Sequence, residues 1–220
     1  MTKVKICGLR TLENALMVAR AGADLIGLNF YPPSPRSLEL ETAGEIAHGL
    51  RLALGADCPT LVGVFVNESA KEMRAIMAAV GLDFAQLSGD EPPEILAGMG
   101  GRAFKAIRPR VNDDAANAVV EYAASFPADD RAPSILVDAY NPKLYGGSGE
   151  TASLAVAEEI QRRAPRLMLA GGLAADNVAE RVRAIRPWGV DVASGVESGI
   201  PGIKDGQKLR AFIRAVRSAS

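Results

Sequence analysis

Short runs rich in apolar and β-branched residues alternate along the chain with longer segments of helical periodicity. In the segment 70–80, for example, Met73, Ile76 and Val80 recur three or four positions apart, the spacing of an apolar stripe on one side of a helix. The strand-type runs begin roughly every 27 residues, which fits one strand followed by one helix. We predict eight strands, over Val4–Cys7, Leu25–Phe30, Leu61–Val66, Phe84–Ser88, Ala103–Arg108, Ile135–Ala139, Leu167–Ala170 and Val190–Ser194. We predict helices over Leu12–Ala21, Glu39–Ala56, Ala70–Val80, Pro92–Met99, Asp114–Ser125, Ser153–Arg163, Asn177–Ile185 and Gln207–Arg217.

The unbroken repeat of strand–helix units predicts an α/β fold, a closed (β/α)8 TIM barrel that forms one domain over residues 1–220. No linker, low-complexity stretch or charge run divides the chain. A doubly wound open sheet is the main alternative, but about six repeats would usually suffice for it. In a barrel the strand-to-helix junctions lie on one face, and barrel enzymes carry their chemistry there.

Alternation within the strands predicts which side chains point into the barrel. In the first strand Val4 and Ile6 share the apolar face, which should meet the helices. Lys5 and Cys7 then point inward, and the same argument turns Asp138 inward at the end of the sixth strand. Three more polar residues follow the same logic: Asn29, Gln86 and Asp191. One mouth of the barrel therefore collects polar groups, which packing alone does not require.

Composition limits the possible partners. Hydrophobic residues make up 48% and charged residues 23% of the chain, which is ordinary for a globular protein. The net charge of −1 provides no overall field for nucleic acid or an anionic membrane, so an anionic ligand needs a local site. We see no signal peptide and no apolar run of about 18 residues, and we expect a cytoplasmic protein, monomeric or alternatively homodimeric, without a membrane partner.

The chain has a single histidine, His48, within a predicted helix, and we interpret it as an ordinary helix residue. No histidine cluster or C-x-x-C pair indicates a metal site, and no nucleotide-binding fingerprint is present, so we expect neither a metal nor another cofactor. An acid–base pair must then come from Cys, Asp, Glu, Lys or Tyr.

Glycine-bearing loops follow the last two predicted strands. Gly172 and Leu173 follow the seventh strand, and Ser194, Gly195 and Val196 follow the eighth. Glycine lets backbone N–H groups approach an oxyanion closely, and barrels often bind phosphate after strands seven and eight. We predict a phosphate site here; the alternative is that the glycines only form tight turns.

Two inward groups are candidates for acid–base chemistry. Cys7 could act as a base or nucleophile once ionised, or could simply be a small buried hydrophobe. Asp138 could serve as a general acid if it is partly shut off from water, or could cap the following loop. That loop, 139–149, contains three glycines and is long enough to cover a ligand.

A proline-rich loop after the second strand ends in Arg36. Prolines at 32, 33 and 35 stiffen it, so the guanidinium would be held in a fixed place that suits capture of a carboxylate or phosphate. The alternative is a surface arginine paired with Glu39 or Glu41.

These pieces, in this order, resemble the phosphoribosylanthranilate isomerase family of tryptophan biosynthesis. The similar strings run through nearly the whole chain: Lys5-Ile6-Cys7-Gly8-Leu9, Gly63-Val64-Phe65-Val66-Asn67, Lys105-Ala106-Ile107-Arg108, Leu169-Ala170-Gly171-Gly172-Leu173, Gly189-Val190-Asp191-Val192, Ser194-Gly195-Val196-Glu197 and Pro201-Gly202-Ile203-Lys204-Asp205. Two positions depart from the family pattern. Ser88 stands where the family usually has histidine, and Thr151–Leu154 replaces a common Phe-Asp-Trp segment.

The resemblance implies an eight-unit barrel that rearranges N-(5'-phosphoribosyl)anthranilate to 1-(2-carboxyphenylamino)-1-deoxyribulose 5-phosphate without a cofactor. It implies that Cys7 is the general base at C2 of the sugar and that Asp138 is the general acid at the ring oxygen. Arg36 would meet the anthranilate carboxylate. The loops at Gly172–Leu173 and Ser194–Val196 would hold the phosphate.

Two other functions stay open from the sequence. A histidine-pathway aminoaldose isomerase would use a pair of aspartates, and an aspartate would be expected where Cys7 stands. A non-catalytic phosphosugar-binding barrel would need no intact acid–base pair, whereas this chain keeps both members.

Overall fold

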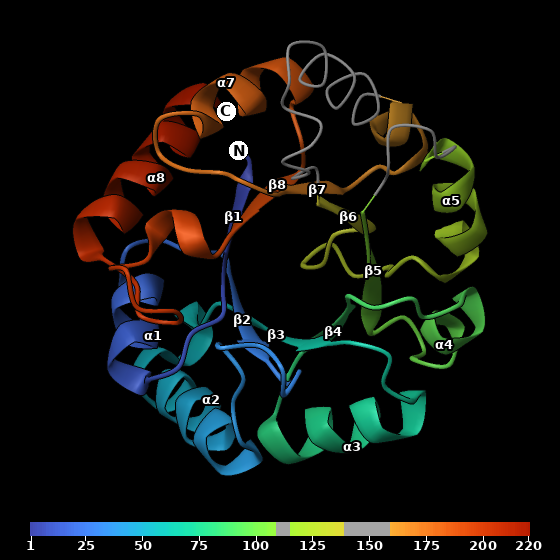
Figure 1. Cartoon of the computed structure of the whole chain (residues 1–220), viewed down its shortest axis with the longest axis horizontal. Coiled ribbons are helices and arrows are strands. Elements are labelled where there is room, and N and C mark those ends of the chain that lie inside the picture. Colours follow the sequence, from blue (N-terminus) through green and yellow to red (C-terminus); the bar gives the residue numbers. More distant parts are fainter. Residues whose placement is uncertain (109–114, 139–158) are drawn as a thin grey trace.

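In a computed structural model the chain forms a closed barrel of parallel strands inside a ring of helices (Figure 1). The structure describes residues 1–108, 115–138 and 159–220, with residues 115–118 described by their backbone alone. The strands are β1 (Lys3–Cys7), β2 (Leu25–Asn29), β3 (Thr60–Phe65), β4 (Phe84–Leu87), β5 (Ala103–Ile107), β6 (Ile135–Asp138), β7 (Leu167–Ala170) and β8 (Gly189–Val192). Each strand pairs with its neighbour in sequence, and β1 pairs with β8 to close the ring. The predicted (β/α)8 architecture is confirmed.

The helices lie outside this ring and follow the strands in turn, with α8 after the last strand (Figure 1). They are α1 (Leu12–Arg20), α2 (Leu40–Leu54), α3 (Ala70–Val80), α4 (Pro93–Ala97), α5 (Ala115–Tyr122), α7 (Val178–Ile185) and α8 (Gly206–Ala219), with short 3₁₀ turns η1 (Gly55–Asp57), η2 (Ala123–Ser125) and η3 (Ser194–Val196). Residues 159–163 are also helical; the first part of the helix predicted over Ser153–Arg163 lies outside the described residues. Within the described residues, no helix is both long and apolar enough to cross a membrane.

Helix α3 shows how local sequence sets an element. The Ser69 side chain caps its start by accepting from the Glu72 backbone N–H at 3.1 Å, and Gly81 ends it in a left-handed conformation with φ of 81°. Met73 and Met77 lie on the buried side. The predicted bounds of this helix are confirmed, whereas the short helix predicted over Pro92–Met99 shrinks to α4.

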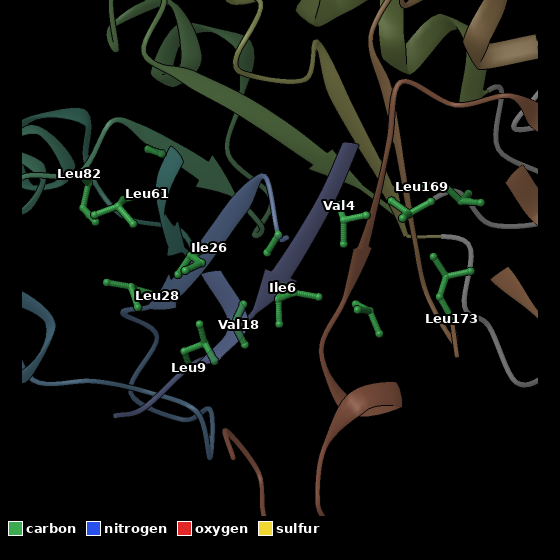
Figure 2. Packing of buried hydrophobic residues seen from close by; sticks show 14 of the residues in the cluster. Val4, Ile6, Leu9, Val18, Ile26, Leu28, Leu61, Leu82, Leu169 and Leu173 are labelled. Carbon is green, nitrogen blue, oxygen red and sulfur yellow. The ribbon is translucent and has the colours of Figure 1, made fainter. Parts of the chain in front are cut away.

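Two apolar layers follow from the alternation along the strands. Val4 and Ile6 of β1 belong to the outer layer, which packs between the sheet and the helices (Figure 2). Leu25, Phe104 and Met168 belong to a separate cluster that fills the inside of the barrel. The predicted outward and inward faces are therefore confirmed, and polar side chains are left to the carboxyl ends of the strands.

Several predicted strands are one or two residues too long. The eighth, predicted over Val190–Ser194, runs from Gly189 to Val192. The chain turns there because the Ser194 carbonyl accepts from the Glu197 backbone N–H at 3.0 Å, which forms η3. Val196, at the end of this turn, is fully buried.

Candidate active site

A cavity of about 230 Å³ opens at the carboxyl ends of β6, β7 and β8. It is lined by Asp138, Ala170, Gly171, Gly172, Leu173, Asp191, Val192, Ala193, Ser194 and Gly195. Five residues predicted for catalysis or phosphate binding therefore share one cavity: Asp138, Gly172, Leu173, Ser194 and Gly195. Val196 is fully buried in η3 behind it. Cys7 and Arg36 belong to neighbouring elements of the same face.

The loops after β7 and β8 pack directly against one another. Gly171 and Gly172 have φ of 97° and 61°, a backbone that residues with a side chain rarely adopt. A Cβ on Gly195 would lie 2.0 Å from the Leu173 carbonyl oxygen, so only glycine fits. A glycine that lines a cavity contributes only backbone to it, and backbone N–H groups suit an oxyanion.

Asn177 braces the loop after β7, a role the sequence did not reveal. Its side-chain amide donates to the Gly172 carbonyl at 3.0 Å, and its side-chain oxygen accepts from the Ala174 backbone N–H at 2.9 Å. An asparagine at the start of a predicted helix, Asn177–Ile185, is the only signal that could have suggested it.

Cys7 is the last residue of β1 and projects toward β2 inside the barrel. Its register partner on β2 is Gly27, and a Cβ on that glycine would lie 2.8 Å from Cys7 Sγ and 3.2 Å from Lys5 Nζ. The missing side chain of Gly27 thus makes room for both groups. Burial raises the pKa of the Cys7 thiol, and nearby Lys5 and Lys204 oppose the rise only in part. The resting group is accordingly a thiol.

Lys5 and Asp191 form an ion pair inside the barrel. Lys5 Nζ lies 3.0 Å from Asp191 Oδ1, and none of the lysine side chain is exposed. Burial lowers the pKa of Lys5, but Asp191 and the neighbouring Cys7 raise it more, so the net pKa is above its usual value. The sequence predicted both residues to point inward but not that they pair.

Asp138 ends β6 and faces the cavity with 35% of its side chain exposed. Its Oδ2 lies 3.9 Å from Nε of Arg108, whose side chain is 66% exposed, so this ion pair is a weak one. The carboxyl group is therefore partly shielded and still accessible to a ligand. The glycine-bearing loop 139–149 and the Thr151–Leu154 departure after it lie outside the described residues.

Arg36 is held by Glu197. The alternative that it pairs with Glu39 or Glu41 is therefore wrong. Arg36 Nε and Nη2 donate to the two carboxylate oxygens of Glu197 at 2.8 and 2.7 Å. Gly8, with φ of 75°, lies directly beneath the arginine, because a Cβ there would be 2.5 Å from Arg36 Cδ. The guanidinium thus lies beside the residue that follows Cys7.

Glu197 also binds the segment that precedes α8. Besides Arg36, it accepts from Lys204 Nζ at 3.0 Å and from the Gly202 backbone N–H at 2.8 Å. Burial alone would raise the pKa of Glu197, but these donors outweigh it and lower the pKa from 4.5 to about 2. Arg36 lies 161 positions away in sequence, which is why no local pattern indicated the pair.

Ser88, which stands where the family usually has histidine, lies beside Gln86 in the barrel. The Gln86 side-chain amide donates to the Ser88 hydroxyl at 3.1 Å. Ser88 and Gln86 are both buried. His48 is exposed on α2, consistent with an ordinary helix residue. Within the described part of the chain, no group of three or more His, Cys, Asp or Glu side chains could hold a metal ion.

Residues 4–215 match the family model of N-(5'phosphoribosyl)anthranilate (PRA) isomerase. The chain is 45% identical to the N-(5'-phosphoribosyl)anthranilate isomerase of Roseiflexus sp. (strain RS-1), with 100% of both chains covered.

Two solved structures are similar throughout. One is phosphoribosyl anthranilate isomerase from Thermotoga maritima, with a TM-score of 0.83, 34% identity, and coverage of 99% of this chain and 100% of that one. The other is a phosphoribosyl anthranilate isomerase in complex with reduced 1-(o-carboxyphenylamino)-1-deoxyribulose 5-phosphate, with a TM-score of 0.82, 31% identity, and coverage of 99% of this chain and 100% of that one.

Proposed function

This chain belongs to the N-(5'-phosphoribosyl)anthranilate isomerase family, and on that premise we propose that Cys7 is the general base and Asp138 the general acid of its reaction. The chain is an isomerase of tryptophan biosynthesis and acts on a small phosphorylated substrate. The observation that carries the proposal is the shared cavity, in which Asp138 faces the two glycine loops. Cys7 ends β1, which is separated from β6 only by β7 and β8.

The reaction needs one acid and one base. Asp138 donates a proton to the furanose ring oxygen, the C1–O bond breaks, and the anthranilate nitrogen forms a Schiff base at C1. The Cys7 thiolate then removes the proton from C2, and the electron pair moves to give an enolamine. Return of a proton to C1, with loss of the proton on the C2 hydroxyl, yields the ketone. Substrate and product have the same atoms, so no oxidant or reductant enters.

We assign the phosphate of the substrate to the loops Gly172–Leu173 and Ser194–Val196. The left-handed glycines after β7 and the close contact of Gly195 with the Leu173 carbonyl support this, because they expose backbone to the cavity. Anchoring the phosphate fixes the sugar between the acid and the base. Such positioning typically contributes more to rate than either proton transfer.

We assign the anthranilate carboxylate to Arg36. The two bonds to Glu197 use Nε and Nη2, which form one edge of the guanidinium. Arginine has five N–H donors, so the edge formed by Nη1 and Nη2 can take a second carboxylate. The neighbouring Gly8 lets this group lie close to Cys7.

The first experiment follows the loss of anthranilate-type fluorescence when the purified chain acts on substrate generated in situ, with a chelator present. We expect Cys7→Ala and Asp138→Asn each to lower kcat by at least about 10²-fold while affinity for a reduced product analogue changes little. Arg36→Met should instead mainly raise KM.

Cys58→Ser provides the matched control, because this second cysteine lies just before β3 and away from the cavity. It should retain wild-type turnover. Wild-type rates in Cys7→Ala would refute the assignment of the base without touching the family assignment.

A further inference from the structure

The Lys5–Asp191 ion pair is a candidate for a role beyond the acid and the base. The two residues are register partners where β1 pairs with β8, and their charged atoms lie 3.0 Å apart. Lys5 is fully buried, and the Asp191 side chain is 10% exposed. A buried ion pair is often no more stabilising than apolar residues of similar volume. Stability alone is therefore a weak reason for placing these charges in the barrel.

The position of Lys5 beside Cys7 supplies a better reason for placing these charges in the barrel. Lys5 and Cys7 point inward from the same strand, and both lie against the space that a side chain on Gly27 would fill. A Cβ there would be 3.2 Å from Lys5 Nζ and 2.8 Å from Cys7 Sγ. The ammonium and the sulfur can consequently be at most about 6 Å apart. An opposite charge within this distance favours the ionised form of a group. Asp191 also lines the cavity, so the ion pair reaches from Cys7 to the proposed phosphate site.

Other charges near Cys7 come from each surrounding element. Lys204 precedes α8 and Arg36 follows β2, and each lies close enough to interact with the sulfur. Both of these cations are already bound to Glu197. Lys5 is paired with Asp191, and of the surrounding cations it lowers the pKa of Cys7 the most. Asp191 acts in the opposite direction and raises it.

We propose that Lys5 is a positioning residue whose charge stabilises the Cys7 thiolate, and that Asp191 limits how much of that charge reaches the sulfur. The inference rests on the proposed role of Cys7 as the base. Lys5 keeps its proton throughout, so it transfers none. Its ammonium lies beside the thiolate when the thiol ionises and remains there after the thiolate has taken the proton from C2.

The two members of the pair have opposite predicted effects, which makes the proposal testable without substrate. In the Cys58→Ser background Cys7 is the only remaining thiol, and its pKa can be read from the pH dependence of alkylation by iodoacetamide, followed by mass spectrometry. Lys5→Met should raise this pKa and slow alkylation at neutral pH by about tenfold or more. Asp191→Asn should lower the pKa and speed alkylation. The pH profile of kcat/KM should shift in the same directions.

Lys105→Met is the matched control. Lys105 is also a buried lysine in an ion pair, 2.7 Å from Glu91, but it lies in β5 on the helix side of the sheet. It should leave the Cys7 pKa unchanged. Circular dichroism checks that each variant folds. If Lys5→Met does not fold, the effect of Asp191→Asn on the Cys7 pKa still tests the proposal.

A Cys7 pKa that stays constant in Lys5→Met and Asp191→Asn, or that moves in the same direction in both, would overturn the proposal. A failure of the proposed function can be distinguished from a failure of this inference. If Cys7→Ala turned over at the wild-type rate while the thiol pKa still responded to Lys5 and Asp191, the base assignment would be wrong and the electrostatic inference would stand.

Discussion

At the scale of single residues, Cys7, the proposed general base, must ionise before it can take a proton. Burial raises the pKa of the thiol, and the nearby lysines do not fully compensate. The thiolate fraction therefore grows as pH rises toward and beyond the ordinary thiol value of about 8.5. We expect kcat/KM to increase with pH between about 7 and 9, measured by the fluorescence assay in overlapping buffers. A profile that is flat or falls over this interval would contradict a thiolate base.

Glu197 gives a second pH dependence, this time in stability. Its pKa is lowered from 4.5 to about 2 in the folded chain, so its contribution is fully present above pH 4.5. The contribution disappears as pH falls from 4.5 toward 2, and is at most about 3 kcal/mol. We expect urea unfolding to show this loss in the wild type and a much smaller one in Glu197→Gln.

Glu197→Gln should also be less stable at neutral pH, because Lys204, whose side chain is fully buried, loses its carboxylate. Glu39→Gln is the control: Glu39 is exposed, so both its neutral-pH stability and its acid dependence should match the wild type. Equal acid dependence in Glu197→Gln and the wild type would show that another carboxylate causes the loss.

At the scale of elements, the pairing of β1 with β2 places Gly27 opposite Cys7. Gly27→Ala would put a methyl group 2.8 Å from the sulfur, so the sulfur must move. Misplacing a reacting group by about 1 Å can cost roughly 10²-fold in rate. We expect Gly27→Ala to lower kcat at least tenfold.

The matched control for Gly27→Ala is Gly44→Ala. Gly44 is in helix α2, and nothing lies within 4 Å of where its Cβ would be. This substitution should leave kcat unchanged and stabilise the helix by up to about 1 kcal/mol, measured by urea unfolding. A wild-type kcat in Gly27→Ala would mean that the position of Cys7 is not critical.

Period-two alternation was enough to predict which side chains of β1 and β6 enter the barrel, because the rule depends only on neighbours in sequence. It could not predict the ion pairs, because Lys5 and Asp191 are 186 positions apart and meet only when β1 closes against β8. Strand ends were less accurate for a similar reason. The eighth predicted strand ran on to Ser194, which belongs to the turn η3, and the hydrogen bond of that turn leaves no mark in the pattern.

At the scale of the whole molecule, the repeat of strand–helix units was the strongest sequence signal. Eight units of similar length leave few alternatives to a closed ring, and ring closure then fixes which loops meet. The cavity between β6, β7 and β8 follows from that closure, so the sequence could place five of its lining residues together. Asn177 was missed, because its contacts support the backbone of the loop and leave no periodic trace.

Because the proposed phosphate site joins the loops after β7 and β8, an occupied site should stabilise the barrel as a whole. A ligand that binds only the folded chain stabilises it by about 2.7 kcal/mol at a concentration of 100 times Kd. For a chain of this size that corresponds to a rise in Tm of roughly 5–10 °C. We expect this rise with inorganic phosphate or the reduced product analogue in differential scanning calorimetry. Gly195→Ala should abolish it, because its Cβ would collide with the Leu173 carbonyl oxygen and push the two loops apart. Sodium chloride at the same ionic strength controls for screening, and an equal rise in chloride would show that the anion is not held at a specific site.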